Sequence, residues 1–96
     1  MTYSLEFKES ALKEWRKLDG AIRAQFKKKL AERLERPRVA SARLAGMADC
    51  YKIKLNNAGY RLVYQVDDQR IVVIVVAVGK RENFAMYRSA EGRLKE

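Results

Sequence analysis

The sequence predicts an α+β fold, in the order strand, helix, helix, three strands and a short helical tail. Apolar and polar residues alternate at positions 3–7 and again from position 51, which is typical of half-buried strands. Apolar residues recur at helical spacing between positions 11 and 34, and positions 71–78 are apolar on both faces, as in a central strand. We therefore expect one domain over residues 1–96, in which a small antiparallel sheet of about four strands carries an N-terminal helical hairpin on one face.

The first half of the chain is predicted to form two helices after the first strand. Their apolar stripes consist of Ala11, Leu12, Trp15 and Leu18, followed by Ile22, Phe26, Leu30 and Leu34. Asp19 and Gly20 mark the turn between the helices, with Asp19 as the cap of the second, and Pro37 prevents that helix from continuing. Because Trp15 and Phe26 lie on these stripes, we assign both rings to the core and not to the binding of a nucleotide base.

The second half begins with a predicted hairpin. A four-residue turn at positions 56–59 pairs Leu55 with Tyr60. The same register puts Lys54 opposite Arg61, and Lys52 projects from the same face because side chains alternate along a strand. Three cations are therefore expected on one face of the first hairpin.

A second hairpin is predicted to follow, with its turn at positions 67–70. This turn pairs Val66 with Ile71. Strict alternation along the last strand then places Val72, Ile74, Val76, Val78 and Lys80 on the face that carries Lys52 and Lys54. Positions 83–95 are predicted to form a weak helix that Gly92 interrupts.

The composition of the chain is strongly basic. There are 21 Lys and Arg against 12 Asp and Glu, which gives a net charge of +9 and a sequence pI near 9.9. Such an excess attracts phosphate backbones, although it also serves solubility. The absence of histidine excludes His-paired nucleophiles, His-ligated metals and cleavage of RNA by paired histidines. Cys50 is the only cysteine, so no internal disulfide and no Cys-rich metal site is expected, and no cofactor is predicted.

We expect a cytoplasmic protein without membrane association. The first residues lack the basic segment and long apolar run of a signal peptide. The longest apolar stretch, at positions 71–78, is far shorter than the roughly 20 residues that a spanning helix needs.

The face predicted to carry Lys52 and Lys54 has an apolar floor and a cationic rim. The rim consists of Lys52, Lys54, Arg61, Lys80 and Arg81, with Tyr87 nearby. Like charges across a strand pair are destabilising, and no acidic residue occurs at positions 50–55 or 60–66 to neutralise them. Arg binds phosphate bidentately, Lys supplies a point charge and Tyr stacks on bases. The pattern favours RNA binding over an edge that Lys and Arg protect against aggregation. Most cations of the two helices are interpreted as a solvated outer face.

Four segments of the sequence resemble the RelE toxins. They are residues 50–55 (CYKIKL), 59–66 (GYRLVYQV) and 78–82 (VGKRE), together with residues 11–18 (ALKEWRKL), which match the first helix of that family. The resemblance covers nearly the whole chain, in order and without evident gaps. It implies a small α+β domain in which helices pack on one face of an antiparallel sheet.

The same resemblance implies a function. RelE toxins are endoribonucleases of type II toxin–antitoxin pairs, which cleave mRNA in the ribosomal A site and so inhibit translation. The ribose 2′-hydroxyl attacks the phosphodiester and leaves a cyclic phosphate and a 5′-hydroxyl, without a metal ion. The implied partners are a RelB-like antitoxin, the ribosome with A-site mRNA, and operator DNA, which toxin and antitoxin bind only as a complex.

Residues of matching type occupy the catalytic positions of that family. They are Lys52, Lys54, Arg61, Arg81 and Tyr87. By resemblance, the two arginines bind the scissile phosphate, one of the two lysines assists removal of the 2′ proton, and the tyrosine stacks on a base or shares the acid–base role. The sequence does not divide these roles further.

Two more cations, Arg43 and Lys80, are expected to bind RNA. Close relatives carry an arginine at the position of Ala45, and Arg43 is expected to replace part of that charge. We expect the missing arginine to affect substrate affinity more than the reaction.

Two alternatives stay open on the sequence alone. A ParE-like toxin shares the fold but blocks DNA gyrase without cutting anything, although gyrase inhibition gives no reason for the cationic face. The other alternative is a basic ribosome- or DNA-binding module with no toxicity.

Overall fold

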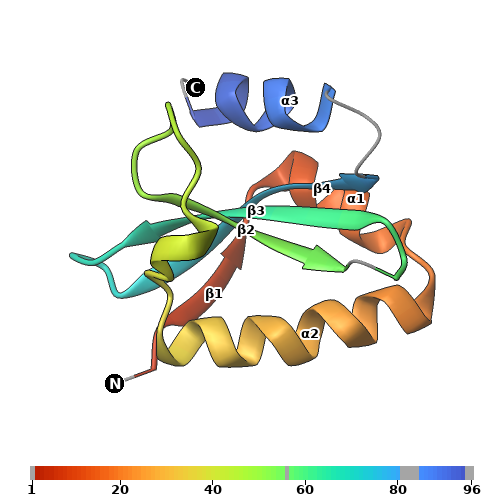
Figure 1. Ribbon diagram of the computed structural model, residues 1–96, viewed down its shortest axis with the longest axis horizontal. Helices are drawn as coiled ribbons and strands as arrows, with labels where there is room; N and C mark the ends of the chain where they lie inside the picture. The colour runs from red at the N-terminus through yellow and green to blue at the C-terminus, as the bar shows by residue number, and fades with distance from the viewer. Residues whose placement is uncertain (1, 56, 81–84, 95–96) are drawn as a thin grey trace.

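The computed structural model describes residues 2–55, 57–80 and 85–94, without the side chains of residues 85–89. Its elements are β1 (Ser4–Phe7), α1 (Glu9–Arg16), α2 (Gly20–Glu35), the short 3-10 helix η1 (Ala40–Ala42), β2 (Cys50–Leu55), β3 (Tyr60–Asp67), β4 (Val72–Lys80) and α3 (Ala85–Leu94). The order of elements is the predicted one, and Figure 1 shows one sheet with helices on both sides. None of the described helices is long and apolar enough to cross a membrane.

The sheet is mixed, which corrects the expectation of a purely antiparallel one. Its strand order is β1-β4-β3-β2. The pairs β2–β3 and β3–β4 are antiparallel, but β1 runs parallel to β4, with Phe7 opposite Val75. Turns fix the directions of β2, β3 and β4, whereas two helices separate β1 from β2 and leave the direction of β1 unconstrained.

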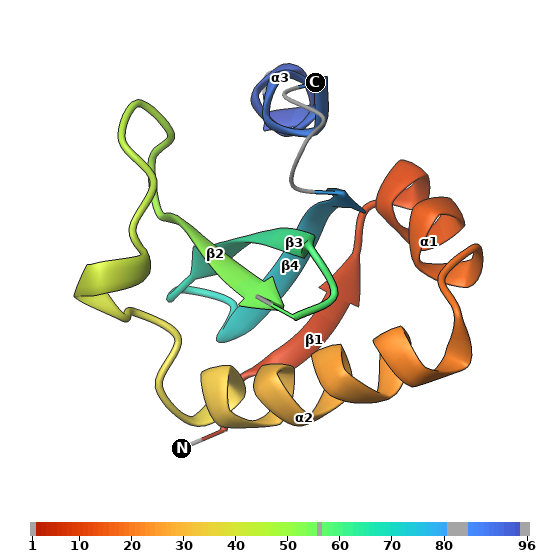
Figure 2. The same cartoon turned by 45° about the vertical axis from the view of Figure 1, so that its right-hand side comes forward.

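Helices α1 and α2 cover one face of the sheet, as predicted. Trp15 of α1 and Phe26 of α2 are buried between the helices and the sheet, with ring centroids 6.2 Å apart. The prediction that both rings belong to the core is thus confirmed. The two helices do not lie along each other as a tight hairpin, since α1 packs on β4 and α2 on β2 (Figure 2). Asp19 occupies the N-cap position of α2, but its side chain makes no capping hydrogen bond.

The opposite face has a smaller apolar cluster, which α3 covers (Figures 1 and 2). Its buried members are Cys50, Val63, Val76, Ala77 and Ala90, and Leu44, Met47 and Leu94 pack against them. We call this side of the sheet the α3 face.

The predicted second hairpin is wrong by two residues. Val66 pairs with Val73 and not with Ile71, and β3 runs on to Asp67, which pairs with Val72. The reason lies in the side chain of Asp67, which accepts hydrogen bonds from the backbone N–H groups of residues 69 and 70. This Asx turn places the reversal after Asp67, and Ile71 adopts a left-handed conformation with φ 55°.

A bulge in β4 corrects the predicted position of Lys80. Val63 pairs with Ala77 and Tyr64 with Val75, so Val76 is the extra residue. Beyond the bulge the alternation reverses: Ala77 belongs to the α3 face, and Val78 packs in the core under α1 and α2. Lys80 pairs with Tyr60, which also packs against that core, so the register puts Lys80 on the opposite face from Lys52 and Lys54.

Candidate nucleic-acid interface

The β2–β3 hairpin places three predicted site residues together on the α3 face. Leu55 pairs with Tyr60 and Lys54 with Arg61, which confirms the predicted register. Lys52 alternates with Cys50, a buried member of the α3-face cluster. Because alternate residues of a strand share a face, Lys52, Lys54 and Arg61 project from the same side of the sheet. We call these three residues the cationic triad.

The triad combines positive charge with partial burial. Lys54 is exposed, while Lys52 and Arg61 are half-buried. Lys52 pairs with Val63 and Lys54 with Arg61, which also pairs with Gly79 of β4, so the ladders supply no acidic neighbour. Packing two like charges across a ladder costs up to about 1 kcal/mol. A bound phosphate would offset this repulsion, so the arrangement favours a site that binds an anion.

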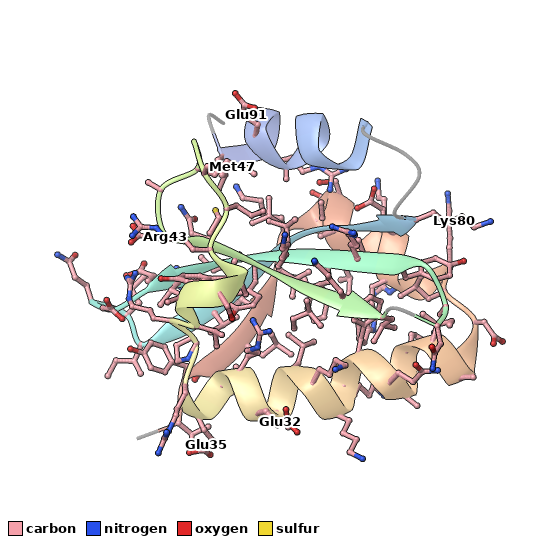
Figure 3. All side chains as sticks on the ribbon, viewed as in Figure 1. Glu32, Glu35, Arg43, Met47, Lys80 and Glu91 are labelled. Atoms are coloured by element: carbon pink, nitrogen blue, oxygen red, sulfur yellow. The ribbon has the colours of Figure 1, made fainter. Side chains whose placement is uncertain are left out.

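The remaining predicted site residues have different outcomes. Arg81 lies outside the described residues, and Tyr87 lies on the backbone of α3 but its side chain is outside them too. Arg43 and Lys80 are both exposed and stand at opposite ends of the molecule, as Figure 3 shows. The structure therefore brings Lys52, Lys54 and Arg61 together and keeps Arg43 and Lys80 away from each other.

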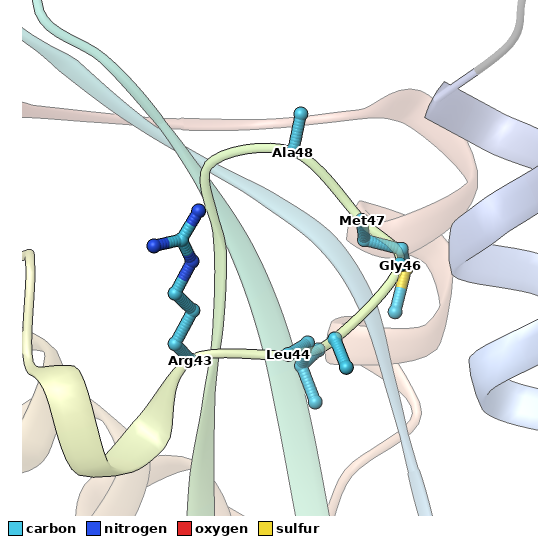
Figure 4. Close-up of a pocket in the computed structure, with 6 residues that line it drawn as sticks. Arg43, Leu44, Gly46, Met47 and Ala48 are labelled. Atoms are coloured by element: carbon cyan, nitrogen blue, oxygen red, sulfur yellow. The ribbon is translucent and has the colours of Figure 1, made fainter.

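A loop before β2 borders the α3 face and forms an open pocket of about 510 Å³. Residues 43–48 line it (Figure 4). The loop bends at Gly46, whose φ of 81° is a left-handed conformation that suits glycine. Met47 packs against the α3-face cluster, whereas Ala45 is exposed. Ala45, the position at which the resemblance led us to expect an arginine, thus lies on an accessible loop.

An ion pair fastens α3 to the sheet, and sequence reasoning missed it. Arg93 Nη1 donates to Glu14 Oε1 at 2.8 Å and to the carbonyl of Val76 at 2.8 Å, while Glu14 Oε1 accepts from the N–H of Val78 at 3.2 Å. Only 15% of the Arg93 side chain and 34% of the Glu14 side chain is exposed. The pair therefore couples α1, β4 and α3 at a partly desolvated position.

Arg33 is a second residue whose position the sequence did not reveal. Most cations of the two helices were expected on a solvated outer face, yet Arg33 is half-buried. Its Nη1 donates to the carbonyl of Lys52 at 3.2 Å and to the hydroxyl of Tyr64 at 2.9 Å. The signal was present, because Arg33 follows Phe26 by seven residues and Leu30 by three, which places it beside the apolar stripe.

Comparisons with known proteins agree with one another. The family model of the ParE toxins of type II toxin–antitoxin (ParDE) systems matches residues 5–83. The mRNA interferase toxin RelE of Escherichia coli strain K12 is 57% identical over 94 residues, which are 98% of this chain and 99% of that protein. A solved structure of a variant of E. coli toxin RelE in the free state has a TM-score of 0.91 at 56% identity, covering 98% of this chain and 99% of that one. The toxin chain of the intact E. coli RelBE toxin–antitoxin complex has a TM-score of 0.81 at 60% identity, covering 84% of this chain and 99% of that one.

Proposed function

This chain belongs to the RelE toxins of type II toxin–antitoxin systems, and on that premise we propose that it is an endoribonuclease that cleaves mRNA in the ribosomal A site. The observation that carries the proposal is the cationic triad, which gathers on one face without an acidic cross-strand partner. The high identity with RelE favours cleavage over the alternative of a ParE-like inhibitor of gyrase. A RelB-like antitoxin, binding of operator DNA by the pair and a cytoplasmic location complete the proposal.

The proposed reaction is a transesterification. The ribose 2′-oxygen attacks phosphorus, the bond from phosphorus to the 5′-oxygen breaks, and the products are a cyclic phosphate and a 5′-hydroxyl. One proton leaves the 2′-hydroxyl and one reaches the 5′-oxygen, and no metal ion is required. Without histidine, the chain must handle these protons with Lys, Tyr, Asp, Glu or Arg, or leave them to water.

The triad suits stabilisation of the charge that develops on the phosphate. A guanidinium held on a strand and two ammonium groups beside it preorganise positive charge where the phosphorane oxygens become more negative. We assign Arg61 and Arg81 to the scissile phosphate and Lys52 or Lys54 to the 2′-hydroxyl. We place Tyr87 against a base, and Arg43 and Lys80 on flanking RNA.

A ribosome-programmed cleavage assay tests the proposal. Mapping of mRNA 5′ ends is expected to show cuts at A-site codons, and naked RNA is expected to stay intact. Arg61→Ala and Arg81→Ala are each expected to slow cutting about 100-fold to 1,000-fold, the usual cost of losing one charge-stabilising donor. Lys28→Ala serves as the matched control, since Lys28 is an exposed cation of α2 that does not belong to the triad.

Three results would contradict the proposal. They are cutting by Arg61→Ala at the rate of the unaltered chain, equal cutting of naked RNA, and DNA damage signals with intact mRNA after expression in cells. The last result would point to gyrase and restore the ParE-like alternative. Growth unaffected by expression without an antitoxin would instead favour a non-toxic binding module.

A further inference from the structure

A second basic site lies where α2 and η1 meet the outer edge of β2. It is a groove of about 270 Å³, bordered by Lys29, Glu32 and Arg33 of α2, Ser41 of η1, and Lys52 and Lys54 of β2. Four of these side chains are cationic and one is acidic. Figure 2 shows the three elements that border it, with β2 at the edge of the sheet, η1 beside it and α2 across one face.

Arg33 is fixed in this groove before any ligand arrives. One of its nitrogens, Nη1, is bonded to the Lys52 carbonyl and the Tyr64 hydroxyl, and the guanidinium lies 5.8 Å from the centre of the Tyr64 ring. The Tyr64 hydroxyl in turn donates to the carbonyl of Pro37 at 2.6 Å. Guanidinium carries five N–H donors, so these contacts orient the group and leave Nε and Nη2 without an acceptor among the described residues.

Lys29 adds a second charge to the same groove. It lies one helical turn before Arg33 on α2 and is exposed. None of the ion pairs recorded among the described residues involves Lys29, Arg33 or Lys52. Glu32 is the one carboxylate at the groove, and it too takes no part in those pairs. The groove therefore keeps a net positive charge available to a ligand.

We infer that this groove binds a phosphate of an RNA backbone, so that the RNA path on the protein continues from the cationic triad around the β2 edge to α2. The inference rests on the proposed function for its choice of RNA as the ligand. Continuity favours RNA over an acidic protein segment, because Lys52 and Lys54 border the groove and also belong to the triad. An oriented guanidinium binds phosphate bidentately, and an ammonium group beside it adds a point charge.

Binding of an uncleavable RNA tests the inference without requiring catalysis. The full chain is titrated with a single-stranded RNA whose riboses are 2′-O-methylated, over a series of salt concentrations. Lys29→Gln is expected to weaken binding about threefold to tenfold and to reduce the slope of log K against log salt by about 0.7, the value for one phosphate contact on a single strand. Glu32→Gln is expected to strengthen binding severalfold, the opposite sign.

Two neighbours on the same helix provide matched controls. Lys28→Gln removes the same charge from outside the groove, and Glu35→Gln removes an exposed carboxylate while keeping an oxygen for its hydrogen bond from Thr2. Both are expected to bind RNA as the unaltered chain does. Because all four positions are exposed, circular dichroism and thermal melting are expected to be unchanged.

The source of the phosphate is decided by a second titration, with the small ribosomal subunit. An effect of Lys29→Gln on the oligonucleotide assigns the groove to the substrate strand, and an effect on the subunit alone assigns it to ribosomal RNA. The inference is wrong if Lys29→Gln and Lys28→Gln behave alike in both titrations. It is also wrong if Lys29→Gln weakens only the binding of polyglutamate, which stands for an acidic protein segment in a parallel titration. Loss of mRNA cutting with these binding effects intact would instead count against the proposed function.

Discussion

The two faces of the sheet are stabilised in different ways. The face under α1 and α2 buries large side chains, including Phe26, Leu30 and Tyr64, in one continuous core. The α3 face buries a smaller cluster, of which Val76 and Ala77 are typical, and α3 is fastened there by the Glu14–Arg93 pair. The larger core lies on the first face, and the second face carries the cationic triad. The division separates the main core from the face that we propose to bind RNA.

The largest effect is expected from a cavity in the helix-covered core. Phe26 is fully buried, so Phe26→Ala is expected to lower the free energy of unfolding by about 3–5 kcal/mol in urea denaturation. Val76→Ala, at a fully buried position of the α3 face, is expected to cost about 2 kcal/mol. An equal cost at the two positions would break the distinction between the faces.

The second largest effect is expected from alkaline pH, which lowers the stability that burial of Cys50 on the α3 face provides. Burial raises the pKa of the Cys50 thiol to about 11. The unfolded chain releases this proton at lower pH than the folded one, so the stability that the neutral thiol contributes is full below about pH 8.5 and is lost as pH rises toward 11. Denaturation curves between pH 8 and 11 are expected to fall on the order of 1 kcal/mol further for the unaltered chain than for Cys50→Ala. Parallel curves would show that Cys50 does not titrate in this way.

The attachment of α3 is expected to depend on charge. Glu14→Gln keeps an oxygen for the Val78 N–H but removes the ion pair with Arg93, at a cost of about 1 kcal/mol for a pair that is only partly buried. Hydrogen exchange is expected to speed up in α3 and to stay slow in β3. Uniform acceleration over the whole sheet would mean that the pair supports the entire fold.

The smallest effect is expected at the triad and has the opposite sign. Lys54→Thr removes the repulsion with Arg61 across the ladder and is expected to stabilise the fold by up to about 1 kcal/mol while slowing mRNA cleavage. A thermal melt and the cleavage assay measure the two quantities. A variant that is more stable and equally active would show that Lys54 serves neither binding nor chemistry.

Local pattern predicted most of the architecture and the grouping of the triad on one face. Alternation and turn composition gave the β2–β3 register, and with it the pairing of Lys54 with Arg61. The position of Lys80 was wrong because a bulge at Val76 changes the parity of the strand, and none of the apolar residues around Val76 signals an extra residue. The parallel direction of β1 was also not predicted, since it depends on contacts between segments that are distant in the sequence.

Side chains that act between elements were the other class that the pattern missed. Glu14 and Arg93 are 79 positions apart, and each looks like an ordinary charge on an amphipathic helix until the fold brings them together. Arg33 was easier to find, because its spacing from Leu30 places it at the margin of the buried stripe. Its bond to the Lys52 carbonyl, however, required knowing that β2 is an edge strand.

The Glu14–Arg93 pair also has a bearing on self-association. Strand β1 pairs with β4 only as far as Val75, and beyond it the two charged side chains occupy the carbonyl of Val76 and the N–H of Val78. A strand from another molecule would need those same backbone groups in order to add to the sheet. A copy of the chain that ends before Arg93 leaves the carbonyl of Val76 without this donor, so we expect C-terminal truncation to favour edge-to-edge association.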